Sequence, residues 1–222
     1  MSGPVEKWVK RIAAVLLLPV CLGTAKTLII VANTVGDADT FWVAALSGAA
    51  CWVVVYFTLP KPMLIYVLGH ELTHVIWTWA FGGKVRSFKA TASGGFVVVT
   101  RNNFLIALAP YFFPLYVVIV IAAFALGHWL WGWKQHLALF HFLVGAAYAF
   151  HVTLTQYTLS IRQSDITQQG YLFSAVVIWL GNVLVLLIGL PLLTAKVELI
   201  TTFGWIWKST LDVLEQAYRV FL

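Results

Sequence analysis

The chain is dominated by long apolar runs that short polar stretches separate. Six of these runs are about 20 residues long, which is enough for a helix to cross the hydrocarbon core of a bilayer. They cover residues 12–32, 41–58, 62–81, 103–126, 136–158 and 171–194. The pattern therefore predicts an all-α integral membrane protein with about six transmembrane helices.

The first run is the least regular of the six. Pro19, Gly23 and Lys26 interrupt it, so a tilted or re-entrant helix is an alternative to a full crossing. Basic residues followed by an apolar stretch also resemble a secretory signal peptide. Because a polytopic protein needs no cleaved signal, we favour a segment that is retained.

Residues 82–103 are too polar to cross a membrane. Two Gly-Gly pairs bracket "KVRSF" and "FVVVT", short segments rich in β-branched residues that predict a small membrane-side β-hairpin. An exposed sheet edge can hold an unwound peptide by strand addition, and a purely structural cap is the alternative. The cations of this segment favour a cytoplasmic position for it: Lys84, Arg86, Lys89 and Arg101.

From residue 195 onward, apolar and charged positions mix at helical spacing. The charged side chains mostly lie off the predicted apolar face, which carries Ile206, Leu211, Leu214, Tyr218 and Phe221. The tail is therefore predicted to be an amphipathic helix that lies in the membrane interface.

Composition agrees with a membrane protein. The 222 residues are 61% hydrophobic and 10% charged, whereas soluble domains are about a quarter charged. The net charge of +6 is spread over loops and ends without a basic face, so we expect contact with anionic lipid and no nucleic-acid binding. Cys21 and Cys51 both lie in apolar runs, which argues against a disulfide framework and a cysteine-based metal site.

The polar exception inside an apolar run is "LGHELTHVIW", residues 68–77. His70 and His74 are four positions apart, so on a helix they lie one turn apart on the same face and can share a metal ion. Ionisable groups inside a membrane are costly and mark functional sites by default. This HExxH pattern predicts a Zn²⁺ site that hydrolyses peptide bonds, with Glu71 as the general base.

A zinc site of this kind needs a third protein ligand. Asp165 lies in "RQSDITQQGYLFS", just before the last apolar run, where a carboxylate can point back at the helices. The alternative for Asp165 is a helix N-cap or a solvated loop charge. His141 and His151, both in the fifth run, are further candidates for this ligand, with His151 the stronger, and a polar contact inside the bundle also accounts for either of them.

Together these motifs resemble the site-2 protease class of intramembrane metallopeptidases, the M50 type, in its compact bacterial branch. The resemblance rests on "HELTH", the following "GGKV", the Gly-Gly hairpin, the run "NFLIALAPYFFPL" and the late "SDI". It implies that His70, His74 and Asp165 are the zinc ligands and Glu71 the catalytic base. Thr73 stands where such motifs often carry glycine, and the longer Asn-Pro…Leu-Asp-Gly motif is absent.

The resemblance leads us to expect one polytopic membrane domain over residues 1–222, with a metallopeptidase core over 62–194 and the interfacial tail over 195–222. The expected activity is zinc-dependent endoproteolysis in or near transmembrane segments of a membrane-protein substrate, by a multi-pass protein of the bacterial inner membrane. Two alternatives stay open. One is a catalytically silent scaffold or chaperone that retains the metal site, and the other is a transporter or haem protein that uses several membrane histidines.

Overall fold

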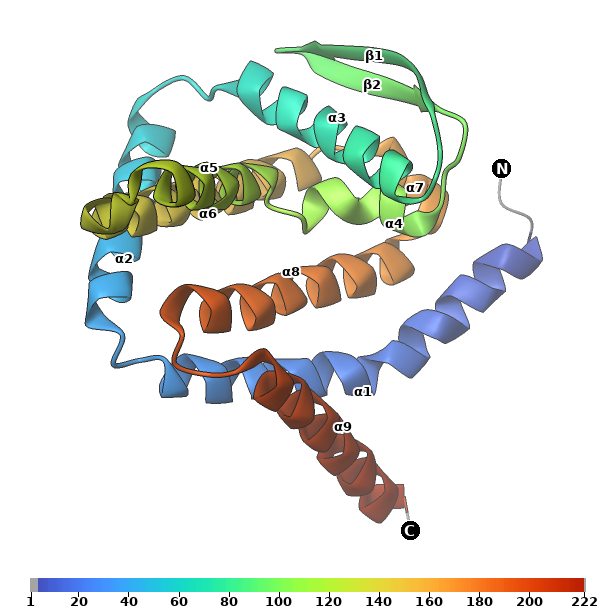
Figure 1. The fold of residues 1–222 in the computed structure, drawn as a ribbon. Helices are drawn as coiled ribbons and strands as arrows, with labels where there is room; N and C mark the ends of the chain where they lie inside the picture. The colour runs from blue at the N-terminus through green and yellow to red at the C-terminus, as the bar shows by residue number, and fades with distance from the viewer. Residues whose placement is uncertain (1–3, 222) are drawn as a thin grey trace. The chain divides into compact units, whose positions relative to one another are not determined.

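The computed structural model describes residues 4–221, which are mostly helical. The chain separates into two compact units (Figure 1). One unit is Asp39–Gln163, and the other combines Met1–Ala38 with Ser164–Leu222.

The number of candidate spans is smaller than the sequence pattern predicts. Among residues 4–221, four helices are long and apolar enough to cross a membrane, and one bent helix pair raises the number to five at most. The six predicted spans are therefore not confirmed. The run over 62–81 does form a helix, α3 (Met63–Ala80), but the polar side chains of its His70, Glu71 and His74 keep it out of this apolar class.

The run over 103–126 is not one helix. It forms α4 (Phe104–Leu108) and the 3₁₀ turn η1 (Ala109–Tyr111), which meet α5 (Leu115–Trp131) at an angle of 78°. Pro114 lies at the break, where it lacks an N–H and disfavours helical backbone at the residue before it.

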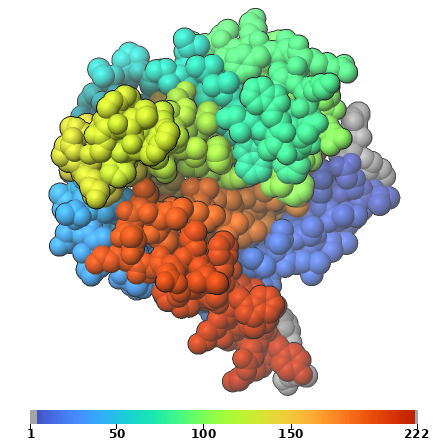
Figure 2. Space-filling model, viewed as in Figure 1, coloured from blue at the N-terminus to red at the C-terminus, as the bar shows by residue number. Residues whose placement is uncertain are grey.

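The hairpin prediction is confirmed within the unit Asp39–Gln163. Strands β1 (Val85–Thr91) and β2 (Gly94–Val99) pair antiparallel, with Lys89 opposite Phe96 and an irregularity between Val85 and Ser87. The hairpin packs along α3, and the two form one continuous green and teal surface in Figure 2. The hairpin therefore sits directly on the helix that carries the HExxH motif.

The same unit is held together by a close helix crossing. Helices α2 (Asp39–Thr58) and α6 (Leu137–Leu159) pack with Gly48 against the Phe142 backbone and Gly145 against the Ala45 backbone. A β-carbon at either glycine would overlap a main-chain carbonyl, so glycine is what allows the two backbones to approach. The 3₁₀ turn η2 (Trp133–His136) leads from α5 into α6.

The other unit is built on a long first helix. Helix α1 (Pro4–Thr34) runs through Pro19 without a break and packs against α8 (Tyr171–Thr194) and α9 (Leu199–Phe221). Its Thr24, Thr27 and Val31 are buried, so α1 is an integral part of this folded unit.

The amphipathic C-terminal helix is confirmed as α9. Its Thr202, Ser209 and Val213 are buried, whereas Leu211, Leu214 and Tyr218 of the predicted apolar face are exposed. Ile206 of the same predicted face is half-buried, and the side chain of Phe221 lies outside the described part of the chain. A short helix, α7 (Ser164–Gln169), precedes α8.

Candidate metal centre and cleft

Helix α3 places the HExxH residues as their spacing predicts. It begins at Met63 after Pro62 and ends at Ala80, just before Gly82, whose φ of 70° is one that glycine adopts readily. The rings of His70 and His74 are half-buried, with their centroids 5.1 Å apart. The two imidazoles are therefore neighbours on one face of the helix.

The His74 ring is held by a main-chain carbonyl. Its Nδ1 lies 2.8 Å from the carbonyl oxygen of Ile106 in α4. A carbonyl can only accept, so Nδ1 carries the proton and the Nε2 lone pair is the one that can coordinate a metal. Metal-ligating histidines usually have their second nitrogen oriented in this way.

The Ile106 carbonyl is itself positioned by a helix cap. The side chain of Asn103 accepts a hydrogen bond from the Ile106 N–H at 2.9 Å and so caps α4. Sequence reasoning missed this support for His74. The available signal was an asparagine directly before an apolar run, but only the fold brings that helix to α3.

Aromatic rings surround His70. The ring of Tyr111, which is fully buried, meets it edge-on with centroids 5.2 Å apart, and the Tyr66 ring centroid lies 6.0 Å away. Tyr66 packs in turn against Leu154 of α6. These large buried neighbours limit the rotamers that His70 can adopt.

Glu71 is buried at 7% exposure and lies against the hairpin. A β-carbon on Gly95 of β2 would lie 2.7 Å from Glu71 Cγ and 2.8 Å from Glu71 Oε1. Only glycine lets a strand backbone come this close to the carboxylate. The hairpin therefore fixes the side chain predicted to be the general base.

A cleft of about 370 Å³ opens beside His70 and Glu71. Its volume falls within the range of ligand-binding clefts. Three parts of the unit form its other walls: the start of α3, the hairpin turn over residues 92–95, and the end of α6 with the residues after it, including Tyr157, Thr158 and Gln163. The cleft thus gives a ligand access to both motif residues.

A second, much smaller cavity lies between His70 and His151. Its volume of about 20 Å³ is room for one water molecule. His151 is 7% exposed, and within the described residues its Nε2 has no hydrogen-bond partner. In Asp39–Gln163, no third His, Cys, Asp or Glu offers a ligand atom close enough to both motif histidines to complete a three-ligand group. His151 therefore lies beside His70 but outside any three-ligand group of this unit.

Asp165, the predicted third ligand, belongs to the other unit. It is half-buried and is the second residue of α7, so it is not the residue that caps that helix. Its role as a ligand stays a prediction. The structure thus brings together His70, Glu71 and His74 on α3 and places Asp165 on a separate short helix.

No protein-family model matches this sequence, and no curated protein or solved structure matches it either. The candidate function therefore rests on the chemistry of the residues described above.

Proposed function

We propose that this protein is a zinc-dependent intramembrane endopeptidase that hydrolyses peptide bonds in or near transmembrane segments of membrane proteins. The observation that carries the proposal is the arrangement on α3. His70 and His74 lie side by side, the Ile106 carbonyl orients His74, and Glu71 faces a cleft that the hairpin borders.

The donor set fits a zinc ion. His70, His74 and Asp165 would hold it, which leaves a fourth position open for water. Asp165 follows Gln163, a residue of the cleft wall, by two positions, so the two Cα atoms are at most about 7 Å apart. When bound, zinc would supply a Lewis acid for the scissile carbonyl and an activated water.

Glu71 would act as the general base. Its carboxylate would take a proton from the attacking water and deliver it to the leaving amine. Burial against the β2 backbone holds this carboxylate in place before the substrate arrives, which is the preorganisation that catalysis needs. A scaffold that uses metal only for stability has no need of a carboxylate in this position.

The substrate would be an unwound segment of a membrane protein. The hairpin is mostly exposed, and its outer edge can hold an extended peptide by strand addition beside the cleft. Helices apolar enough to cross a membrane support a multi-pass location in a lipid bilayer, such as a bacterial inner membrane. The haem alternative is disfavoured because the cavity between His70 and His151 has room for only one water.

The test combines metal content with hydrolysis of a model single-span substrate in proteoliposomes. We expect about one zinc per chain in the wild type and in Glu71→Gln, and its loss in His74→Ala and Asp165→Asn. His128→Ala is the matched control, because His128 is exposed and outside the site. Hydrolysis should be lost in all three site variants and kept in the control.

Two results would contradict the proposal. A wild-type protein that carries no zinc when it is handled without chelators would contradict the proposed metal centre. A Glu71→Gln variant that hydrolyses the substrate at the wild-type rate would show that Glu71 is not the general base. A wild-type protein that binds zinc but does not hydrolyse the membrane substrate would favour the alternative of a catalytically silent scaffold.

A further inference from the structure

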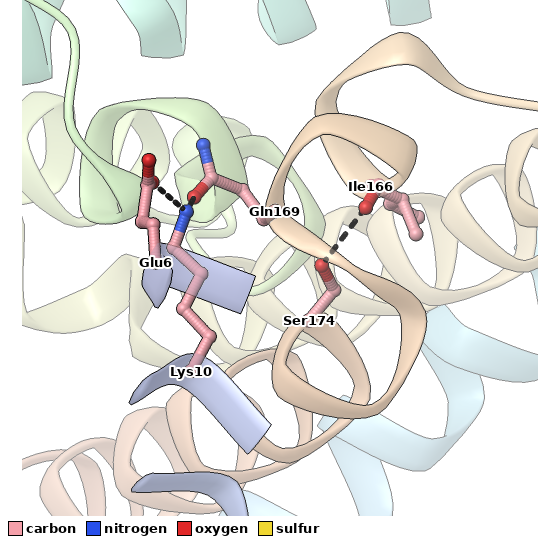
Figure 3. Close-up of polar contacts among 5 residues, drawn as sticks. All are labelled: Glu6, Lys10, Ile166, Gln169 and Ser174. Carbon is pink, nitrogen blue, oxygen red and sulfur yellow. Dashed lines mark hydrogen bonds and ion pairs between the residues drawn. The ribbon is translucent and has the colours of Figure 1, made fainter. Parts of the chain in front are cut away.

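The helix that carries Asp165 is too short to hold its own position. Helix α7 has six residues, and isolated helices of this length are not stable in water. It joins α8 through Gly170, whose φ is 91° and whose N–H donates to the Ile166 carbonyl at 2.8 Å. The hydroxyl of Ser174, a buried residue of α8, donates to the same carbonyl at 3.4 Å (Figure 3). Contacts with neighbouring elements therefore decide where α7 lies.

Helix α1 provides a further contact at Gln169, the last residue of α7, next to Gly170. The Lys10 ammonium donates to Gln169 Oε1 at 2.8 Å and to Glu6 Oε1 at 2.6 Å (Figure 3). The Lys10 side chain is only 17% exposed, whereas that of Glu6 is 52% exposed. Glu6 lies one turn before Lys10 on α1, so it steadies the ammonium beside the Gln169 amide.

We propose that Lys10 is a positioning residue for the metal centre, which it serves by holding Gln169 and thereby α7. The inference rests on the proposed function, in which Asp165 is the third zinc ligand. Asp165 and Gln169 are four residues apart, so they share one face of α7. A bond that holds Gln169 limits rotation of this face about the helix axis, and the carboxylate is thereby preorganised for the metal.

The first helix then has a role in the chemistry besides any membrane anchoring. Loss of the Lys10 contact would remove the restraint that α1 places on Gln169, next to the Gly170 link. More of the ordering of α7 would then have to occur when zinc binds, which lowers affinity without removing a ligand. Supporting residues around metal ligands typically contribute 10–100-fold to affinity.

The experiment measures zinc affinity of the full-length protein in detergent by competition with a chromophoric chelator. We expect Lys10→Met to lower affinity about 10-fold. Lys10→Arg, which can still donate to both acceptors, should retain most of the affinity. Lys7→Met is the matched control, because Lys7 is an exposed residue of the same helix.

A double-mutant cycle separates positioning from general destabilisation. Asp165→Asn loses its zinc on purification, but His70 and His74 can still bind added zinc weakly, and Lys10→Met should not weaken this residual binding further, because the ligand that it positions is gone. An equal loss in both backgrounds would overturn the inference. Gln169→Leu, which keeps the pair between Lys10 and Glu6, should behave like Lys10→Met and replaces it if that variant does not fold.

The outcomes also separate this inference from the proposed function. If Asp165→Asn lowers zinc affinity but neither Lys10→Met nor Gln169→Leu does, the inference fails and the three-ligand site stands. If the wild type binds no zinc, both fail.

Discussion

Gly95 is where the hairpin backbone meets the proposed general base, so Gly95→Ala probes the design of the site without changing any functional group. The added methyl group would lie 2.6 Å from the Lys89 carbonyl oxygen, 2.7 Å from Glu71 Cγ and 2.8 Å from Glu71 Oε1. One of these atoms belongs to the paired strand and two to the carboxylate side chain. Restoring ordinary contact distances would require the hairpin or Glu71 to move by roughly 0.5–1 Å.

The size of the effect follows from that displacement. Overpacking of a close contact costs about 1–3 kcal/mol of stability, which a folded protein can survive. A catalytic group displaced by about 1 Å can lose about 100-fold in rate. We therefore expect Gly95→Ala to retain one zinc per chain, since no proposed ligand is altered, and to lose about 30–100-fold in kcat.

The assay is hydrolysis of a model single-span substrate in proteoliposomes, with zinc quantified in the same preparation. Gly204→Ala in α9 is the control, because a β-carbon there would meet nothing within 4 Å. A Gly95→Ala enzyme with wild-type kcat would show that the β2 backbone does not constrain Glu71, and the reasoning from close approach would be wrong.

Three further predictions concern the α2–α6 crossing and two residues near the site. Gly145→Ala should lower stability by about 3 kcal/mol in thermal unfolding, because its methyl group would overlap the Ala45 carbonyl of α2, whereas Gly189→Ala in open space should not. His151→Phe should keep about one zinc per chain by metal analysis, since His151 is not in a three-ligand group with His70; full loss of zinc would restore it as a ligand. Asn103→Ala should cost about 1 kcal/mol of stability and weaken zinc binding several-fold by chelator competition, because the α4 cap positions the carbonyl that orients His74; unchanged zinc affinity would refute that link.

Local patterns in the sequence were enough to predict most of the secondary structure. The long apolar runs correspond to α2, α6 and α8, one Gly-Gly pair precedes β1 and the other begins β2, and α9 is amphipathic as predicted. The neighbouring positions of His70 and His74 also follow from their spacing alone, since residues four apart on a helix share a face. Each of these features depends on residues close together in the chain.

Features that depend on distant residues needed the tertiary structure. The bend between α4 and α5 turns a predicted span into two helices, although two prolines in "APYFFP" were a local sign of it. The Ile106 carbonyl reaches His74 across 32 positions, and Lys10 reaches Gln169 across 159. Neither contact has a sequence signature. The first uses a backbone atom, and the second joins two common polar side chains. Periodicity determines which face a residue lies on, but only packing determines what that face meets.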